Sequence, residues 1–405
     1  MVPKNLQEIK GLGKFPSDWA IQSADDLTSK ITKGTTPPKS EIIDDPIIPF
    51  LRVNNLSFNG NLNDSSDMIY VSKDAHTKFL ARSIAYPGDI LMNIVGPPLG
   101  KISMLNQDFN EYNMNQAIVV YRTESDKVDN NYFLHYLLSL PAQNWLQSRS
   151  KKTSGQQNLT IEICKSLPVP IPPLPEQQKI AKILSTWDKA ISTTERLIEN
   201  STQQKKALMQ QLLTGKKRLL DESGKRFDGE WEVYKLSKIC SINKGKQINR
   251  STLSDTGACP VINGGITPSG YTESSNTQAN TITISEGGNS CGFVGFQNEA
   301  FWCGGHCYAL QNVKTNNLFL YQFLKFIERK IMALRVGSGL PNIQKKEIEI
   351  VEILVPTHEE QQKIATVLIN ADQEIDLLKQ QLADLQQEKK ALMQVLLTGK
   401  KRVVV

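Results

Sequence analysis

The sequence lacks the features by which membrane, secreted and disulfide-rich proteins are recognised. No stretch approaches the roughly 18 uninterrupted apolar residues of a membrane-spanning helix, and the opening segment MVPKNLQEIKGLGKFP has no apolar run like that of a signal peptide. The six cysteines are scattered over 405 residues, so we expect reduced thiols and no disulfide framework. These absences favour a globular protein without membrane contact, and we expect it in the cytoplasm.

Motifs for catalysis and cofactor binding are equally scarce. The segment GPPLGK (96–101) resembles a phosphate-binding loop, but it is one residue short between its glycines and has Ile102 where a serine or threonine would hold magnesium. A Pro-Gly turn is the better interpretation. No Asn-Pro-Pro-aromatic motif is present, and no glycine-rich cofactor loop follows an expected strand. We therefore expect no catalytic residues and no cofactor bound by this chain.

Histidine is also rare, and the nearest approach to a metal site is CGGHC at 303–307. Cys303, His306 and Cys307 have a tolerable spacing for zinc, with Cys291 upstream as a further ligand, but a second close pair is missing. Buried thiols beside a Gly-Gly bend are the better interpretation. Whether these four residues bind metal stays open.

Net charge is +6, and the basic surplus is uneven along the chain. Residues 175–218 hold 9 basic and 4 acidic side chains, a surplus of five, while the other segments are close to balanced. This distribution differs from the uniformly basic profile of proteins that coat DNA without sequence preference. Composition alone therefore leaves nucleic-acid binding undecided.

The chain contains a long internal repeat. ALMQQLLTGKKR (207–218) returns as ALMQVLLTGKKR (391–402), and the same shift of 184 places EQQKIA (176–181) on 360–365 without a gap. Upstream the shift becomes 212, where FPSDWA answers FDGEWE, and 211 at the following Lys-Gly pair. Two shared segments therefore alternate with two variable ones. We predict four parts: a variable domain at 1–174, a shared helix at 175–218, a variable domain at 219–357 and a shared helix at 358–405.

Each shared segment is predicted to be one long helix. Five prolines in LPVPIPPLP (167–175) favour an extended approach to it, and Thr357 and Glu360 have the spacing of a capping box. Apolar residues then step by threes and fours, which is typical of a coiled-coil seam. The alternative is that each helix packs on its own globular domain. The seam residues are Ile180, Leu184, Trp187, Ile191, Ile198, Leu208, Leu212, Ile364, Leu368, Ile375, Leu378, Leu382, Leu385, Leu392 and Leu396.

Both shared segments end in the same way. Gly215 and Gly399 stand where a left-handed residue closes a helix, and the Lys-Lys-Arg that follows each of them complements the negative end of the helix dipole. Many sequences would serve that purpose, so the near-identity of the two tails needs another reason. Whether Lys216–Arg218 and Lys400–Arg402 contact a partner, DNA or their own helix ends stays open.

This layout resembles the specificity (S) subunit of type I restriction-modification systems. The resemblance rests on LPxPPLPEQQKIA before a long helix, the LTGK-type ending, the second copy, and FPxxW followed by GTTP at 34–37. It implies two mixed α/β target recognition domains separated by two helices that form an antiparallel intramolecular coiled coil. It also implies a chain without catalysis that binds double-stranded DNA and two modification subunits. Those subunits would use S-adenosylmethionine, and two restriction subunits would use ATP with Mg²⁺.

Base edges are read mostly by Arg, Lys, Asn, Gln, Ser and Thr, and phosphates by basic and small polar groups. Loops rich in these residues are the candidates for DNA contact, although an ordinary solvated loop is an equally good interpretation for any one of them. The candidates are Lys33, Thr35, Thr36, Asn54, Asn115, Gln116, Lys151, Lys152, Ser154, Gln156, Lys244, Lys246, Arg250, Asn263, Asn289, Arg335, Ser338 and Asn342.

A tandem repeat with antiparallel helices acquires a pseudo-twofold axis that matches the pseudo-twofold axis of duplex DNA. We therefore expect a split, asymmetric target in which each variable domain reads one half and the helices set the spacing. Two rival hypotheses stay open. One is a self-contained nuclease or methyltransferase with a site around residues 291–307, and the other is a two-headed scaffold with no DNA role.

Overall fold

The computed structural model describes residues 5–63, 67–153, 155–337, 339 and 341–404. Its contacts divide the chain into two compact units: unit 1 comprises residues 1–195 and 381–405, and unit 2 comprises residues 196–380. Both divisions fall inside a long helix, because each unit contains the beginning of one helix and the end of the other. The four-part division proposed from the sequence stays a prediction. Within the described ranges, no helix is long and apolar enough to cross a membrane.

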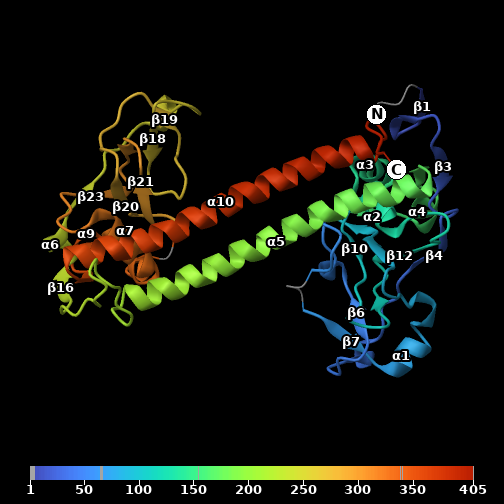
Figure 1. The fold of residues 1–405 in the computed structure, drawn as a ribbon, viewed down its shortest axis with the longest axis horizontal. Coiled ribbons are helices and arrows are strands. Elements are labelled where there is room, and N and C mark those ends of the chain that lie inside the picture. Colours follow the sequence, from blue (N-terminus) through green and yellow to red (C-terminus); the bar gives the residue numbers. More distant parts are fainter. Residues whose placement is uncertain (1–4, 64–66, 154, 338, 340, 405) are drawn as a thin grey trace. The chain divides into compact units, whose positions relative to one another are not determined.

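Unit 1 is built on a four-stranded antiparallel sheet in the order β10-β8-β12-β4 (Figure 1). Its central strands, ILMN in β8 and IVVY in β12, are buried on both faces, and the helices α2 and α3 contribute to the same core. A second sheet has the order β11-β6-β7-β5. The first sheet comprises β4 (Thr28–Lys33), β8 (Ile90–Asn93), β10 (Ile102–Met104) and β12 (Ile118–Thr123), and the second comprises β5 (Ile42–Ile43), β6 (Pro49–Leu51), β7 (Ile69–Val71) and β11 (Asn113–Met114).

Shorter elements complete unit 1. The hairpin β13-β14 pairs with β9, and β15 pairs with β3. The remaining strands are β1 (Leu6–Ile9), β2 (Gly13–Pro16), β3 (Ala20–Ser23), β9 (Val95–Gly96), β13 (Lys151–Thr153), β14 (Gln156–Asn158) and β15 (Pro168–Ile171). The helices are α1 (Lys73–Thr77), α2 (Asn130–Leu138), α3 (Leu140–Arg149) and α4 (Ile161–Lys165), with 3₁₀ turns η1 (Lys39–Glu41), η2 (Val53–Asn55) and η3 (Ala81–Ser83).

Unit 2 repeats the same sheet with different residues. Its strands follow the order β17-β23-β20-β21, which matches β4-β12-β8-β10 of unit 1, and α7 contributes to its core as α2 does in unit 1. The sheet comprises β17 (Ser241–Lys244), β20 (Thr281–Ser285), β21 (Val294–Gln297) and β23 (Cys307–Gln311). The other elements are β16 (Glu232–Lys235), β18 (Cys259–Ile262), β19 (Tyr271–Thr272), β22 (Trp302–Cys303), β24 (Glu352–Val355), α6 (Leu236–Ile239), η4 (Arg250–Thr252), α7 (Asn317–Phe326), α8 (Glu328–Ala333) and α9 (Lys345–Glu349). The mixed α/β fold is thus confirmed for both variable regions.

Two helices of 39 residues carry the repeat, α5 (Leu174–Leu212) and α10 (His358–Leu396). All of the predicted seam residues are buried or half-buried. At the helix ends they belong to globular cores: Ile180 and Leu184 share the core of unit 1 with Leu396, and Leu212 shares the core of unit 2 with Ile364. Each helix therefore packs at its beginning on its own globular domain, as the alternative proposed, whereas its end belongs to the core that the other helix enters.

The approach to each helix is extended, as the prolines predict. Strand β15 pairs antiparallel with β3 in unit 1, and β24 pairs with β16 in unit 2. The capping box at Thr357 is only half formed. The Thr357 hydroxyl accepts the Glu360 N–H at 3.5 Å, but the Glu360 carboxylate binds Arg218 and Trp231 and so serves a tertiary contact instead of the cap.

The two closing glycines are in the left-handed region, with φ of 69° at Gly215 and 67° at Gly399. A β-carbon on Gly399 would lie 2.4 Å from Pro16 Cγ, whereas one on Gly215 would come no closer than 3.6 Å to Trp231. We predict that Gly215→Ala costs about 1–2 kcal/mol, the ordinary strain of this backbone conformation, and that Gly399→Ala costs clearly more. Thermal denaturation of the two variants tests this difference, and equal shifts in melting temperature would contradict it.

Candidate nucleic-acid interface and helix clasps

The tail of α5 binds the beginning of α10 within unit 2. Arg218 Nε and Nη2 donate to the two carboxylate oxygens of Glu360 at 2.6 and 2.7 Å, a bidentate pair. Trp231 Nε1 donates to the same carboxylate at 3.3 Å, and the guanidinium carbon lies 5.7 Å from the indole centroid. The Glu360 side chain is fully buried. We call Arg218, Glu360 and Trp231 the clasp of unit 2.

Unit 1 contains a similar arrangement, formed by the tail of α10 and the beginning of α5, although the Trp19 indole N–H has no hydrogen-bond partner within the part of the chain that the structure describes. Arg402 donates two hydrogen bonds of 2.6 Å to Glu176, and its guanidinium carbon lies 5.6 Å from the centroid of Trp19. Asp18 adds a second carboxylate at 2.8 Å. Arg402, Glu176 and Trp19 form the clasp of unit 1. The glutamate of each EQQ motif and the arginine of each KKR motif thus pair with each other, because each arginine binds the glutamate at the beginning of the other helix.

The second residue of each EQQ motif, Gln177 or Gln361, ties the long helix to the globular core. Gln177 accepts the N–H of Asp129, the N-cap of α2, at 2.8 Å and donates to Pro172 O at 2.9 Å. Gln361 makes the equivalent bonds to Asn316, the N-cap of α7, and to Pro356, both at 2.8 Å. The repeat thus anchors the beginning of each long helix to the N-cap of a core helix in its own unit.

A third repeated contact lies further along the helices. Lys389 forms an ion pair with Asp188 in unit 1, and Lys205 forms one with Asp372 in unit 2. The imidazole of His135 lies 3.7 Å from Asp188, and burial together with the charge of Lys389 lowers the pKa of His135 to about 3. His135 is therefore neutral at physiological pH. Gln322, a side chain that cannot titrate, takes the equivalent place beside Asp372 at 2.7 Å.

In unit 1 a close backbone approach gathers some of the DNA-contact candidates. A β-carbon on Gly34 would lie 2.1 Å from Met114 O, so only glycine lets the end of β4 meet the β11–β12 connection. This contact brings Lys33, Thr35 and Thr36 beside Asn115 and Gln116, with the Thr35 N–H bonded to Met114 O at 3.0 Å. Arg82 donates to Thr35 Oγ1 at 2.9 Å. Arg82 was not among the sequence candidates.

The other candidates of unit 1 lie elsewhere. Asn54 is exposed in η2, and Lys151 and Gln156 belong to the β13-β14 hairpin, which pairs with β9 next to the GPPLGK segment. Lys152 belongs to the same hairpin, and its side chain lies outside what the structure describes, as do Ser154 and Ser338.

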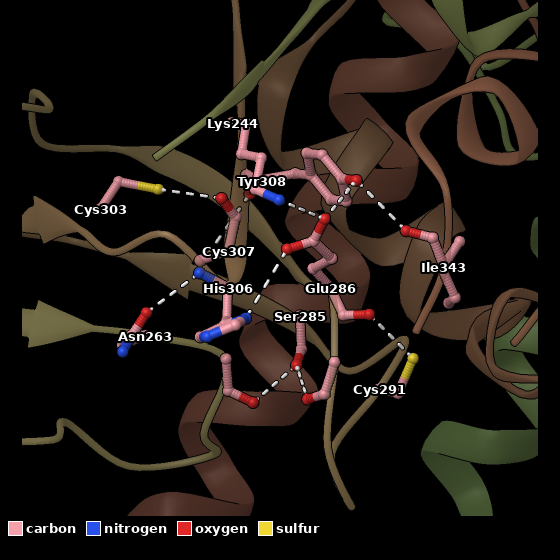
Figure 2. Close-up of polar contacts among 12 residues, drawn as sticks. Lys244, Asn263, Ser285, Glu286, Cys291, Cys303, His306, Cys307, Tyr308 and Ile343 are labelled. Carbon is pink, nitrogen blue, oxygen red and sulfur yellow. Dashed lines mark hydrogen bonds and ion pairs between the residues drawn. The ribbon is translucent and has the colours of Figure 1, made fainter. Parts of the chain in front are cut away.

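Unit 2 has the same close approach, because a β-carbon on Gly245 would lie 2.2 Å from Gly304 O. Here the loops converge on the carboxylate of Glu286 (Figure 2). Lys244 Nζ lies 2.6 Å from its Oε1, Tyr308 Oη donates to the same oxygen at 3.0 Å, and His306 Nδ1 lies 3.8 Å from Oε2. Asn263 Oδ1 accepts the His306 N–H at 3.0 Å. Of the sequence candidates, Lys244 and Asn263 are brought to this cluster, whereas Glu286, His306 and Tyr308 were not among the candidates.

Residues 341–343 lie beside the loop that contains Glu286. Gly288 N donates to Pro341 O at 3.0 Å, and Ile343 N donates to Glu286 O at 2.8 Å. Asn342 pairs through its backbone with Gly287. Like Asn342, the remaining candidates of unit 2 have exposed side chains: Lys246, Arg250, Asn289 and Arg335.

The thiols near this cluster are buried and hydrogen-bonded. Cys303 Sγ donates to Cys307 O at 3.5 Å, and Cys291 Sγ donates to Glu286 O at 3.1 Å. A hydrogen bond with the Cys303 thiol, together with burial, raises the pKa of Cys307, which disfavours the thiolate that zinc requires. Among the described residues, no group of three His, Cys, Asp or Glu side chains could hold a metal ion.

Two regions of the chain match a known protein family. Residues 16–201 and 228–387 match the family of the type I restriction modification DNA specificity domain. The MjaX protein of Methanocaldococcus jannaschii, assigned as a type I restriction enzyme specificity subunit, is 28% identical over 97% of this chain and 96% of its own. The MjaVIII specificity subunit of the same archaeon is 25% identical over 99% and 96%. In fold, the chain is similar to the crystal structure of the type I S subunit from M. genitalium, with a TM-score of 0.67 at 19% identity, covering 98% of this chain and 99% of that one.

Proposed function

The chain belongs to the type I restriction modification DNA specificity family, and from this premise we propose that it reads a bipartite DNA sequence for a methyltransferase and nuclease complex. Each unit reads one half of an asymmetric target in double-stranded DNA. The paired helices set the spacing between the halves, since 39 helical residues have a length of about 58 Å. Acting on DNA agrees with the cytoplasmic location that we expect.

One observation carries this proposal: the two units keep the same clasp and the same Gly34 or Gly245 contact but differ in the side chains placed beside it. Unit 1 places Thr35, Asn115 and Gln116 there, whereas unit 2 places Lys246 and His306 in the corresponding loops. A common framework with different hydrogen-bonding groups is what two readers of different base sequences need. A two-headed scaffold without a DNA role gives no reason for such loops.

The helices also carry exposed residues that are identical in both copies and that the clasps leave free to meet other molecules. They lie near the two tails: Lys206 and Lys390, Ala207 and Ala391, Gln210 and Gln394, Lys216 and Lys400, and Lys217 and Lys401. We propose that each copy docks one modification subunit, so that two identical partners bind, and that two restriction subunits join the full complex. Catalysis, S-adenosylmethionine, ATP and Mg²⁺ belong to those partners. A self-contained enzyme would need a catalytic site in this chain.

Methylome sequencing of cells with and without this gene, with the partner genes kept, tests the proposal. We expect one adenine-methylation motif with two specified halves and an unspecified spacer to disappear when the gene is removed. Expression of the intact gene in the deleted cells is the control and should restore the motif. Unchanged methylation motifs in the deleted cells would contradict the proposal.

A further inference from the structure

We propose that Lys244 and His306, positioned by the buried carboxylate of Glu286, read a guanine of the half-site recognised by unit 2. This inference rests on the proposed function and assigns specific residues to it. Lys244 would donate to guanine O6 or N7 in the major groove, the acceptors that lysine commonly recognises. His306 would add a second N–H donor, and Glu286 acts as a positioning residue.

The three side chains come from three different elements at one edge of the sheet (Figure 2). Lys244 ends β17, Glu286 follows β20, and His306 precedes β23. The Glu286 side chain is 13% exposed, while those of Lys244 and His306 are 53% and 63% exposed. The carboxylate thus lies beneath two groups that reach solvent.

Glu286 is itself held from several directions. Tyr308 Oη donates to its Oε1 at 3.0 Å, its N–H donates to His306 O at 2.9 Å, and its carbonyl accepts Ile343 N–H at 2.8 Å. A lysine on the surface normally samples many rotamers. Lys244 is restrained by a fixed carboxylate 2.6 Å away. Such restraint suits a side chain that must match the edge of one base.

The charge of the pair favours base reading over phosphate binding. A phosphate contact draws its energy from the positive charge of the protein group, but the Glu286 carboxylate offsets the charge of Lys244. The ammonium group still has N–H donors besides the one that faces Glu286. A neutralised, oriented donor is poorly suited to a phosphate and well suited to an acceptor on a base.

Unit 1 lacks this arrangement, so the reading would be confined to one half-site. The pairing of Ser285 with Cys307 in unit 2 corresponds to that of Asn93 with Ile118 in unit 1. Glu286 therefore corresponds to Ile94, which is 4% exposed and belongs to the hydrophobic core. Lys33 is the counterpart of Lys244, so the position that holds a carboxylate beside Lys244 holds the apolar Ile94 in unit 1.

Methylome sequencing of cells carrying the whole complex with single variants of this chain tests the inference. In Lys244→Ala and His306→Ala we expect the preference for one G·C pair in one half of the motif to fall about tenfold, with the other half unchanged. Glu286→Gln keeps the size of the side chain but removes its charge, and it should relax the same base pair. Lys238→Ala is the matched control, because this exposed lysine on α6 carries the same charge at the opposite end of β17.

The outcomes separate this inference from the function it rests on. A relaxed base pair in Lys244→Ala, absent in Lys238→Ala, supports it. An unchanged motif, or weaker methylation at every site with the same base preference, would overturn it, since the latter is the behaviour of a phosphate contact. If the unaltered complex gives no motif that depends on this gene, the proposed function itself fails.

Discussion

Replacing Glu360 with alanine should destabilise unit 2 by about 3–5 kcal/mol, because the substitution leaves the Arg218 guanidinium partly buried without its carboxylate. Glu360 is fully buried, and Arg218 is only 18% exposed. For a unit of this size, such a loss lowers the melting temperature by roughly 10 °C. Thermal denaturation, with hydrogen exchange to locate the change, measures the effect. Peptides from β16, β24 and the beginning of α10 should exchange faster.

Three further variants test whether the loss of stability comes from the buried ion pair. Glu359→Ala removes the neighbouring exposed carboxylate and should change stability by less than about 0.5 kcal/mol. Glu176→Ala in unit 1 should cost less than Glu360→Ala, because Arg402 keeps Asp18 as a partner. Replacing Arg218 and Glu360 together with leucine should recover much of the loss, since apolar residues can replace a buried pair. If Glu360→Ala and Glu359→Ala were equally stable, the clasp would have no structural role.

Exchanging residues 236–350 for the corresponding segment of another family member should change the DNA target without preventing assembly. The exchanged segment begins after β16 and ends before β24, so the clasp residues Arg218, Trp231 and Glu360 stay in place. The donor segment should have an N-cap residue at position 316, whose N–H donates to Gln361. It should also have an amide or imidazole side chain at position 322, which contacts Asp372. Copurification with the modification subunits checks assembly, and loss of copurification would contradict the expected result.

The sequence predicted the long helices and their ends because those signals are local. The period of apolar residues, the prolines before Leu174 and the closing glycines Gly215 and Gly399 each act within a few residues. The mixed α/β fold followed from the family resemblance, since the variable regions have no repeat that reveals their strands. The coiled-coil interpretation did not predict that the helix ends belong to globular cores. Apolar residues repeat every three or four positions both in a coiled coil and in a helix that packs on a core, so the pattern does not distinguish them.

The clasps and the Glu286 cluster could not be predicted because their partners are distant in sequence. Arg402 and Glu176 are 226 residues apart, and each already had a local explanation at a helix end. Glu286 was not a candidate because the candidates were chosen from basic and small polar residue types, and its neighbours depend on which loops the sheet brings together. For the clasps alone the repeat offered a signal, since the glutamate and the arginine are the same in two copies that otherwise diverge.

The central claim is that each unit reads its own half of one DNA target. The most direct test is the adenine methylome of cells that carry the chain with residues 236–350 exchanged, compared with cells that carry the original chain. We expect one half of the motif and the spacer length to stay the same, while the other half becomes that of the donor. A motif that is unchanged, or one in which both halves differ, would contradict it.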